Sequence, residues 1–96
     1  MNISKSLNDS VLTVSLEGRL DTTTSPMLES ELNDSYEGIT ELILDFAALE
    51  YISSAGLRVI LAAHKMTKGM LKIINVNDSV REIFDITGFS DILNIV

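Results

Sequence analysis

Hydrophobic positions near the start of the chain alternate with polar ones, as they do in a strand with one buried face. Residues 3–7 and 11–16 both follow this period of two, and the turn pair Asn8-Asp9 separates them. The pattern therefore predicts a β-hairpin, with Gly18 ending its second strand.

Helical spacing follows the hairpin. Apolar residues recur every fourth position from Leu28 to Tyr36, Pro26 suits the first helical position, and Ser25 before it suits the N-cap. Gly38 is expected to close this helix. Two further helices are predicted over about residues 54–68 and 78–87, because each segment is followed directly by a glycine that can stop a helix.

Three short apolar runs have the length of strands: Glu41–Phe46, Met70–Val76 and Ile92–Val96. Continuous apolar strands usually have both faces covered, as in a sheet with helical crossovers. The order ββαβαβαβ predicts one α/β domain over residues 1–96, with a mixed sheet of about five strands and about three helices packed through right-handed crossovers. The expected core residues are Leu12, Val14, Leu16, Leu28, Leu32, Ile43, Leu44, Leu57, Ile60, Leu61, Ile73, Val80, Ile83 and Phe84.

The composition excludes several kinds of site. The 96 residues include no cysteine, which excludes disulfides and cysteine-based metal sites, and His64 is the single histidine. We therefore expect neither a metal nor a cofactor. No apolar run approaches the roughly 20 residues that span a bilayer. The N-terminus has no apolar segment like that of a signal peptide, so we expect a cytoplasmic protein.

The formal net charge of −7 is unevenly distributed. No Lys or Arg occurs between Arg19 and Arg58, whereas eight Asp and Glu residues do. Such a chain repels phosphate backbones and anionic lipid surfaces. Nucleic-acid and membrane partners are therefore disfavoured, and a protein partner with a basic patch fits better.

Catalysis by this domain is not expected. A nucleophilic serine needs a base within hydrogen-bond reach, but His64 lies ten positions after Ser54 on the same predicted helix. That separation is about 15 Å along the axis, so His64 is expected to be a partly exposed helix residue instead. The sequence also lacks the G-x-x-x-x-G-K and G-x-G patterns of phosphate-binding loops.

The stretch EYISSAGLRVIL, residues 50–61, places two serines and a glycine at the start of a predicted core helix. The plain interpretation is helix capping, worth about 1 kcal/mol for one serine. The alternative is a chemical switch, since one cap suffices where two serines stand. Gly56 in the first turn also costs up to about 1 kcal/mol relative to alanine, unless another group must come close. A phosphate added here would be favoured by the helix N-terminus.

The segment LDFAALEYISSAGLRVIL, residues 44–61, resembles the central motif of the STAS domain family, specifically that of the bacterial anti-sigma factor antagonists. GRLDTTTSP, residues 18–26, resembles the family's second motif. The resemblance implies that the unphosphorylated protein binds an anti-sigma factor, which is also a serine kinase, and so frees a sigma factor. The kinase uses ATP to phosphorylate one serine, which ends the interaction, and a serine phosphatase restores it.

Aligned with the family motif, Ser54 is the implied phosphate acceptor and Asp21 matches the family's aspartate beside it. Arg58 follows Ser54 by four residues, on the same helix face, where it could pair with a phosphate, remain solvated or contact the partner. We expect the free protein to be a monomer. The residues expected at the partner surface are Asp21, Ser53, Ser54, Gly56, Leu57 and Arg58.

Two other hypotheses stay open. Ser53 stands where the family usually has aspartate, and some relatives act in lipid-transport or stress-sensing assemblies. The second hypothesis is therefore an interaction subunit of such an assembly that is not phosphorylated. Nucleotide binding is the third, and no glycine-rich loop supports it.

Overall fold

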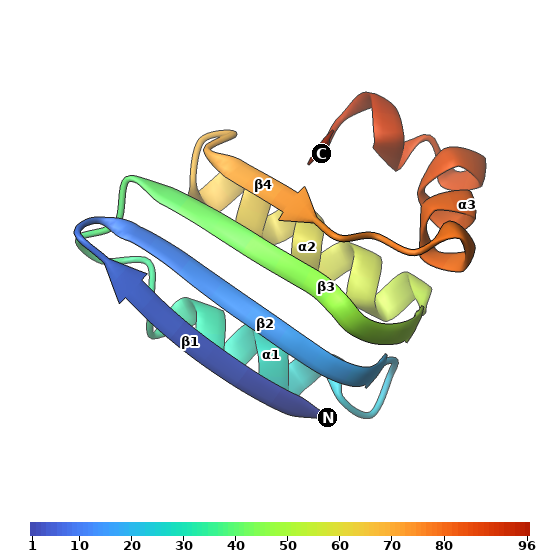
Figure 1. Cartoon of the computed structure of the whole chain (residues 1–96), viewed down its shortest axis with the longest axis horizontal. Helices are drawn as coiled ribbons and strands as arrows, with labels where there is room; N and C mark the ends of the chain where they lie inside the picture. Colours follow the sequence, from blue (N-terminus) through green and yellow to red (C-terminus); the bar gives the residue numbers. More distant parts are fainter.

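The sheet has five strands in the order β1-β2-β3-β4-β5, and only the pair β1–β2 is antiparallel. This is the mixed α/β sheet that the sequence predicts. The computed structural model covers residues 1–96, and Figure 1 follows the chain from the blue hairpin to the red C-terminus. The elements are β1 (Asn2–Asn8), β2 (Val11–Leu20), α1 (Ser25–Asn33), β3 (Glu41–Ile52), α2 (Ser54–Met66), β4 (Leu71–Ile74), α3 (Asp78–Thr87), the 3-10 turn η1 (Phe89–Asp91) and β5 (Asn94–Ile95).

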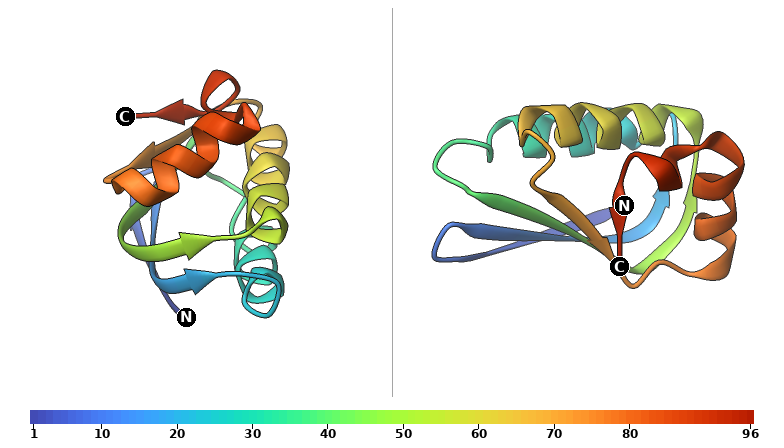
Figure 2. Two further views of the ribbon diagram at one scale, coloured as in Figure 1. Left: turned by 90° about the vertical axis from the view of Figure 1, so that its right-hand side faces the viewer. Right: turned by 90° about the horizontal axis from the view of Figure 1, so that it is seen from above.

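Helices α1 and α2 lie side by side on one face of the sheet, and no helix covers the other face (Figure 2). The expectation that both faces would be covered is therefore wrong. In the apolar run of β3, Leu42 and Leu44 are buried, whereas Ile43 between them is only half-buried. Such alternating burial is typical of a sheet packed on one side.

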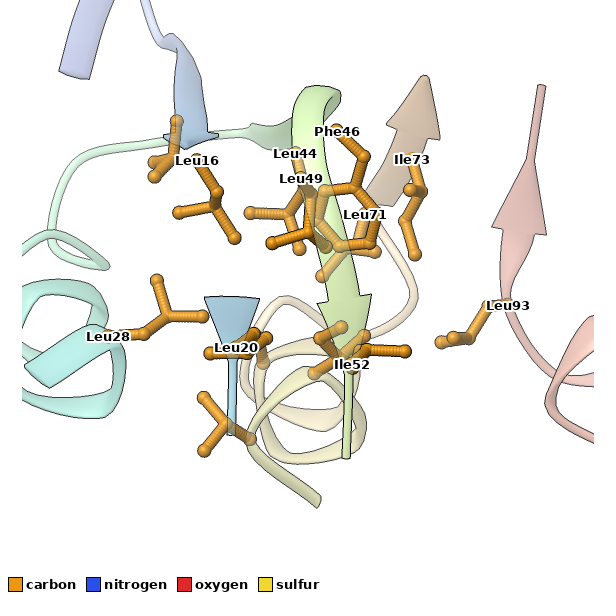
Figure 3. Close-up of a cluster of buried hydrophobic side chains, with 14 of the residues drawn as sticks. Leu16, Leu20, Leu28, Leu44, Phe46, Leu49, Ile52, Leu71, Ile73 and Leu93 are labelled. Carbon is orange, nitrogen blue, oxygen red and sulfur yellow. The ribbon is translucent and has the colours of Figure 1, made fainter. Parts of the chain in front are cut away.

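One cluster of 20 buried apolar side chains fills the space between this face and the helices (Figure 3). The predicted core is confirmed except for Ile43, Leu61 and Ile83, which are half-buried. Leu61 lies on the flank of α2 and outside the buried cluster. The buried apolar side chains that the sequence did not predict are Leu20, Leu42, Phe46, Leu49, Ile52, Val59, Ala63, Leu71 and Leu93.

Strands β2 and β3 both continue past their predicted ends. Gly18 has φ +107°, and the β2–β3 register shifts between Gly18 and Arg19, so the strand bends there instead of ending. A second register shift lies between Ser15 and Glu17. Both strands therefore curl toward the helices (Figure 2) and bring Leu20 and Ile52 into the core.

Helix α1 is shorter than its apolar spacing predicts. It begins at Ser25 with Thr24 as the N-cap residue, and it ends at Asn33. Tyr36 and Gly38 therefore lie in the following loop. Asn, Asp and Ser are weak helix formers, and the Ser35 hydroxyl donates a hydrogen bond to the Glu31 carbonyl (2.6 Å), which helps to end the helix.

In the C-terminal part of the chain, the helix agrees with its predicted bounds better than the other elements do. The predicted bounds of α3 are confirmed, and Gly88 ends it in the left-handed conformation (φ +79°). Helix α2 ends at Met66, before the predicted 68, and β4 is confined to Leu71–Ile74. The predicted last strand keeps only Asn94–Ile95, because Ile92 and Leu93 form a turn and a bend directly after η1.

Two contacts hold α3 against residues 46–49 of β3, directly after the residues 42–45 that pair with β4. The rings of Phe46 and Phe84 stack with centroids 6.3 Å apart. The Asn77 side chain accepts the Val80 N–H (2.8 Å), which caps α3, and donates to the Leu49 carbonyl (2.9 Å). The amide thus satisfies a strand carbonyl and the helix start together.

Replacing Phe84 with Ala should lower the free energy of unfolding by about 3–5 kcal/mol, because it removes a fully buried ring and leaves a cavity. Leu61→Ala is the matched control and should cost less than about 2 kcal/mol, since Leu61 is half-buried. Urea denaturation followed by circular dichroism measures both. Equal losses for the two variants would contradict the core assignment.

Candidate functional site

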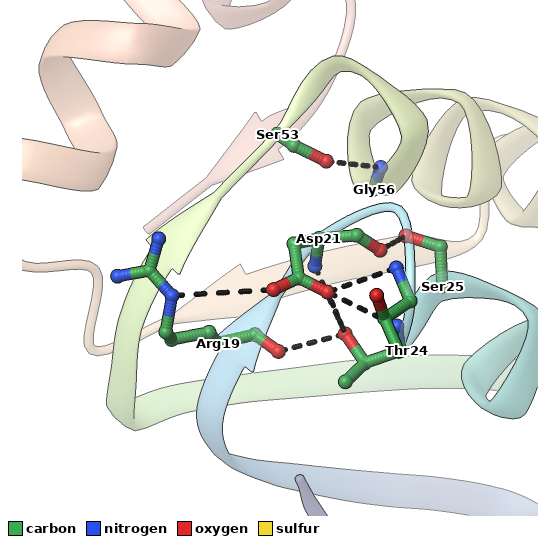
Figure 4. Close-up of polar contacts among 7 residues, drawn as sticks. Arg19, Asp21, Thr24, Ser25, Ser53 and Gly56 are labelled. Carbon is green, nitrogen blue, oxygen red and sulfur yellow. Dashed lines mark hydrogen bonds and ion pairs between the residues drawn. The ribbon is translucent and has the colours of Figure 1, made fainter.

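The two motifs singled out in the sequence meet at the carboxyl ends of β2 and β3 (Figure 4). The Ser53 N–H donates to the Leu20 carbonyl (2.9 Å), which fixes the end of β3 to the end of β2. Asp21 follows Leu20, and α2 begins at Ser54. The start of α2 and the turn before α1 therefore form one continuous edge, which we call the switch edge and define as residues 19–25 and 51–58.

Ser53 is the N-cap residue of α2. Its backbone is extended (φ −101°, ψ 175°), and its Oγ accepts the N–H of Gly56 at 3.4 Å. Its carbonyl accepts the N–H of Leu57 at 3.0 Å. The capping interpretation therefore holds for this serine.

Ser54 is the first residue of α2 and has a different role. Its side chain is exposed. Among the hydrogen bonds at this end of the helix, the side-chain cap is made by Ser53 alone. The Ser53 hydroxyl thus caps the helix, and the Ser54 hydroxyl is accessible. Capping therefore explains the presence of Ser53 but not that of Ser54.

Gly56 and Leu57 are buried within the 51–58 part of the switch edge. A Cβ added to Gly56 would lie 2.7 Å from Leu20 Cγ and 2.9 Å from Ile52 Cγ1, so only glycine fits. Leu57 is 5% exposed and belongs to the core cluster. Their expected place at the partner surface is therefore wrong. Gly56 instead lets the first turn of α2 approach the ends of β2 and β3 closely.

Asp21 organises the turn that precedes α1. Its Oδ1 accepts the N–H groups of Thr23 (3.0 Å) and Thr24 (3.1 Å). The hydrogen bond from the Thr24 N–H is the main cause that lowers the pKa of the Asp21 carboxyl, partly opposed by desolvation. The side chain is still 33% exposed. Asp21 thus has a local structural role while it remains at the surface.

Thr24 and Ser25 complete this turn, and the sequence predicted neither contact. The Thr24 hydroxyl donates to the Arg19 carbonyl (2.7 Å) and accepts the Asp21 N–H (2.9 Å). The Ser25 hydroxyl donates to the Asp21 carbonyl (2.5 Å). The signal in the sequence was the run of hydroxyl residues directly after an aspartate, which favours side-chain-to-backbone bonds.

An exposed pair that the sequence did not reveal flanks Asp21. The guanidinium carbon of Arg19 lies 4.3 Å from the centroid of the Tyr51 ring. Arg19 Nε also lies 4.0 Å from Asp21 Oδ2. The pair forms because the register shift at Gly18 places Arg19 opposite Tyr51. Arg and Tyr are enriched at protein–protein interfaces, and this pair stands at the rim of the switch edge.

Arg58 is exposed one helical turn after Ser54, and it takes part in none of the three ion pairs.

His64 is half-buried further along α2, as predicted, and its Nδ1 is buried without a hydrogen-bond partner. No three His, Asp or Glu side chains are grouped as metal ligands would be. None of the helices combines the length and apolar character needed to cross a membrane.

Comparison with known proteins identifies the family. The family model of the STAS domain matches residues 2–96. BtrV of Bordetella bronchiseptica is 38% identical over 88% of this chain and 76% of its own length. The anti-sigma-B factor antagonist of Bacillus subtilis is 31% identical over 99% of this chain and 90% of its own.

The fold is also that of a solved Bacillus protein, SpoIIAA in its phosphorylated form. That structure matches with a TM-score of 0.76 at 15% identity, over 99% of this chain and 91% of SpoIIAA. The fold, the full-length family match and the two sequence relatives agree. The chain therefore belongs to the STAS domain family and, within it, to the anti-sigma factor antagonists.

Proposed function

We propose that this protein is a cytoplasmic anti-sigma factor antagonist whose binding is switched off by phosphorylation of Ser54. The main support for the proposal is that the two adjacent serines differ. Ser53 caps α2, whereas Ser54 presents an exposed hydroxyl. The antagonist named for Bacillus subtilis supports the anti-sigma factor as partner. The phosphorylated form of SpoIIAA supports this kind of modification on this fold.

The position of Ser54 lets a phosphate change binding without changing the fold. A phosphoserine carries about −1.5 to −2 charges at neutral pH. At a helix N-terminus that charge is favourable by about 0.3–1 kcal/mol, and the first turn of α2 contains no acidic residue that would repel it. A partner surface that fits a small neutral hydroxyl would instead have to bury a bulky dianion, which costs several kcal/mol.

The partner that fits this cycle is an anti-sigma factor that is also a serine kinase. This partner would bind ATP and provide the catalytic groups. The antagonist therefore needs neither a general base beside Ser54 nor a phosphate-binding loop of its own. A serine phosphatase would return Ser54 to its binding form. The acidic composition between Arg19 and Arg58 favours a partner with basic residues around its contact surface.

The first prediction concerns Ser54 itself. Ser54→Ala should keep binding the anti-sigma factor when ATP is present, whereas wild type should lose at least about a hundredfold in affinity once phosphorylated. Ser54→Asp should bind poorly. The thermal midpoints of the phosphorylated and unphosphorylated forms should be similar, because the charge sits at a favourable helix end.

Isothermal titration calorimetry with the purified anti-sigma factor measures these affinities, and Ser53→Ala is the matched control. Ser53→Ala should lose stability through its cap and still be switched by ATP. Equal affinity of the phosphorylated and unphosphorylated forms would contradict the switch and favour an interaction subunit that is not phosphorylated.

Arg58 should stabilise the phosphorylated state. It follows Ser54 by one helical turn and has no other ionic partner, so its guanidinium can pair with the phosphate. Arg58→Ala should therefore lower the thermal midpoint of the phosphorylated protein and leave that of the unphosphorylated protein nearly unchanged. Scanning calorimetry of the four samples measures the difference, and equal shifts in both forms would refute the pairing.

Asp21 should contribute both to the stability of the fold and to binding of the anti-sigma factor, and the two effects can be measured separately. Its folded pKa lies below the ordinary 3.8. The carboxylate therefore contributes stability above the unfolded pKa, and this contribution is lost as the pH falls through the lower folded value. Asp21→Asn keeps an acceptor oxygen for the turn but loses the charge. Its thermal midpoint should be slightly below that of wild type at neutral pH and equal to it well below pH 3.8.

At neutral pH, Asp21→Asn should also bind the anti-sigma factor more weakly, because Asp21 stays partly exposed at the switch edge. Asp21→Ala is the comparison that removes the acceptor as well, and it should be the less stable of the two variants. Unchanged affinity of Asp21→Asn would mean that the residue serves the turn alone.

A further inference from the structure

The sheet has one long free edge. At one side it ends in β5, whose two residues are too short to pair with another strand. At the other side it ends in β1, which has seven residues and pairs only with β2 (Figure 1). A strand of this length with unpaired backbone groups is a site where another strand can add.

The hairpin register identifies the free groups of β1. A two-residue turn, Asp9–Ser10, joins the strands, so Asn8 and Val11 close the hairpin as a hydrogen-bonded pair. Hydrogen-bonded and non-hydrogen-bonded pairs then alternate along the strand. The even-numbered residues of β1 are therefore bonded to β2, and the N–H and C=O groups of Ile3, Lys5 and Leu7 point outward.

The sequence of β1, NISKSLN, is nearly symmetric about Lys5. Two antiparallel copies related by a two-fold axis at Lys5 would place Ile3 opposite Leu7 and Ser4 opposite Ser6. Each of the three residues with outward groups would then donate and accept one hydrogen bond across the axis. The small serines would meet on the uncovered face of the sheet, where their hydroxyls can pair.

The apolar side chains at this edge are incompletely covered in one copy. Leu7 is 62% exposed. It borders a cavity of about 270 Å³ that is lined by Lys5, Leu7, Leu12, Ser35, Glu37 and Ile39. In the symmetric arrangement, Ile3 of the second copy would lie against Leu7 at the mouth of this cavity. The pairing would thus extend the apolar stripe that β1 and β2 already share.

Lys5 is the residue that decides whether the edges can meet. A charged side chain in the middle of an edge strand normally discourages pairing, and two lysines directly opposite repel each other. Here the Lys5 ammonium is held 2.8 Å from Glu31 of α1. In the dimer, each ammonium near the axis would already be paired with the Glu31 carboxylate of its own copy. This charge complementarity offsets the repulsion.

We propose that the β1 edge is a self-association surface, through which two copies of this chain form an antiparallel two-fold dimer with a continuous ten-stranded sheet. This departs from the monomer that we expected from the sequence. It is independent of the proposed switch, because α1 separates the β1 edge from α2 (Figure 1), and Ser54 stays accessible in both copies.

Analytical ultracentrifugation of the full chain tests the proposal. The weight-average mass of wild type should rise from micromolar to millimolar concentration toward twice the monomer mass. Leu7→Pro removes an outward N–H without removing a bond to β2, and by symmetry the dimer loses two hydrogen bonds. Its dissociation constant should rise at least about tenfold while the circular dichroism spectrum is kept. Ile86→Ser, which removes a 76% exposed side chain from α3, is the matched control and should associate like wild type.

Hydrogen exchange measured by NMR locates the interface. The amides of Ile3, Lys5 and Leu7 should become protected as the concentration rises, and those of the even-numbered residues of β1 should not change. A mass that stays monomeric at millimolar concentration would overturn the proposal. A dimer in which these three amides stay unprotected, or one that Leu7→Pro leaves intact, would overturn it equally.

Discussion

The first turn of α2 packs directly on the ends of β2 and β3, and the rest of the switch edge depends on this contact. Gly56 makes it possible, since a Cβ there would overlap Leu20 and Ile52. The bond from the Ser53 N–H to the Leu20 carbonyl joins the two strands at the same point. Together these interactions place the N-terminus of α2 beside Asp21 and fix which serine caps the helix and which is exposed.

That placement puts residues with structural contacts next to residues with exposed side chains. Ser53 and Gly56 are used by the fold, as cap and as contact, and Leu57 is buried in the core. Ser54 and Arg58 are exposed on the same helix and are not needed for packing. In the proposed switch, a charge would therefore be added at Ser54 and removed again without disturbing the contacts beneath it. This is a physical requirement for any site that is modified reversibly on a folded domain.

Much of the fold could be predicted because local patterns agree with it. The element order, the bounds of α3 and most of the predicted core follow from periodicity and from glycines after helices. The failures have tertiary causes. Gly18 was expected to end a strand, but the β2–β3 register turns it into a bulge. Nothing in the local sequence shows that β3 extends beyond the end of β4. It also does not show that the Leu49 carbonyl accepts a hydrogen bond from the Asn77 side chain there.

The site was predictable in part for the same reason. The motif placed Asp21 near the two serines, and the strand register does bring them together. Burial of Gly56 and Leu57 could not be read from spacing, because it depends on how closely the helix approaches the sheet. The Arg19–Tyr51 pair was missed because its members are 32 positions apart and meet only through the shifted register.

The most direct test of the central claim is to locate the phosphate by tandem mass spectrometry after incubating the protein with the anti-sigma factor kinase and ATP. The account predicts a single phosphate on Ser54, with the capping Ser53 unmodified. A phosphate on Ser53, or none on either serine while the kinase is active on itself or on another substrate, would contradict it.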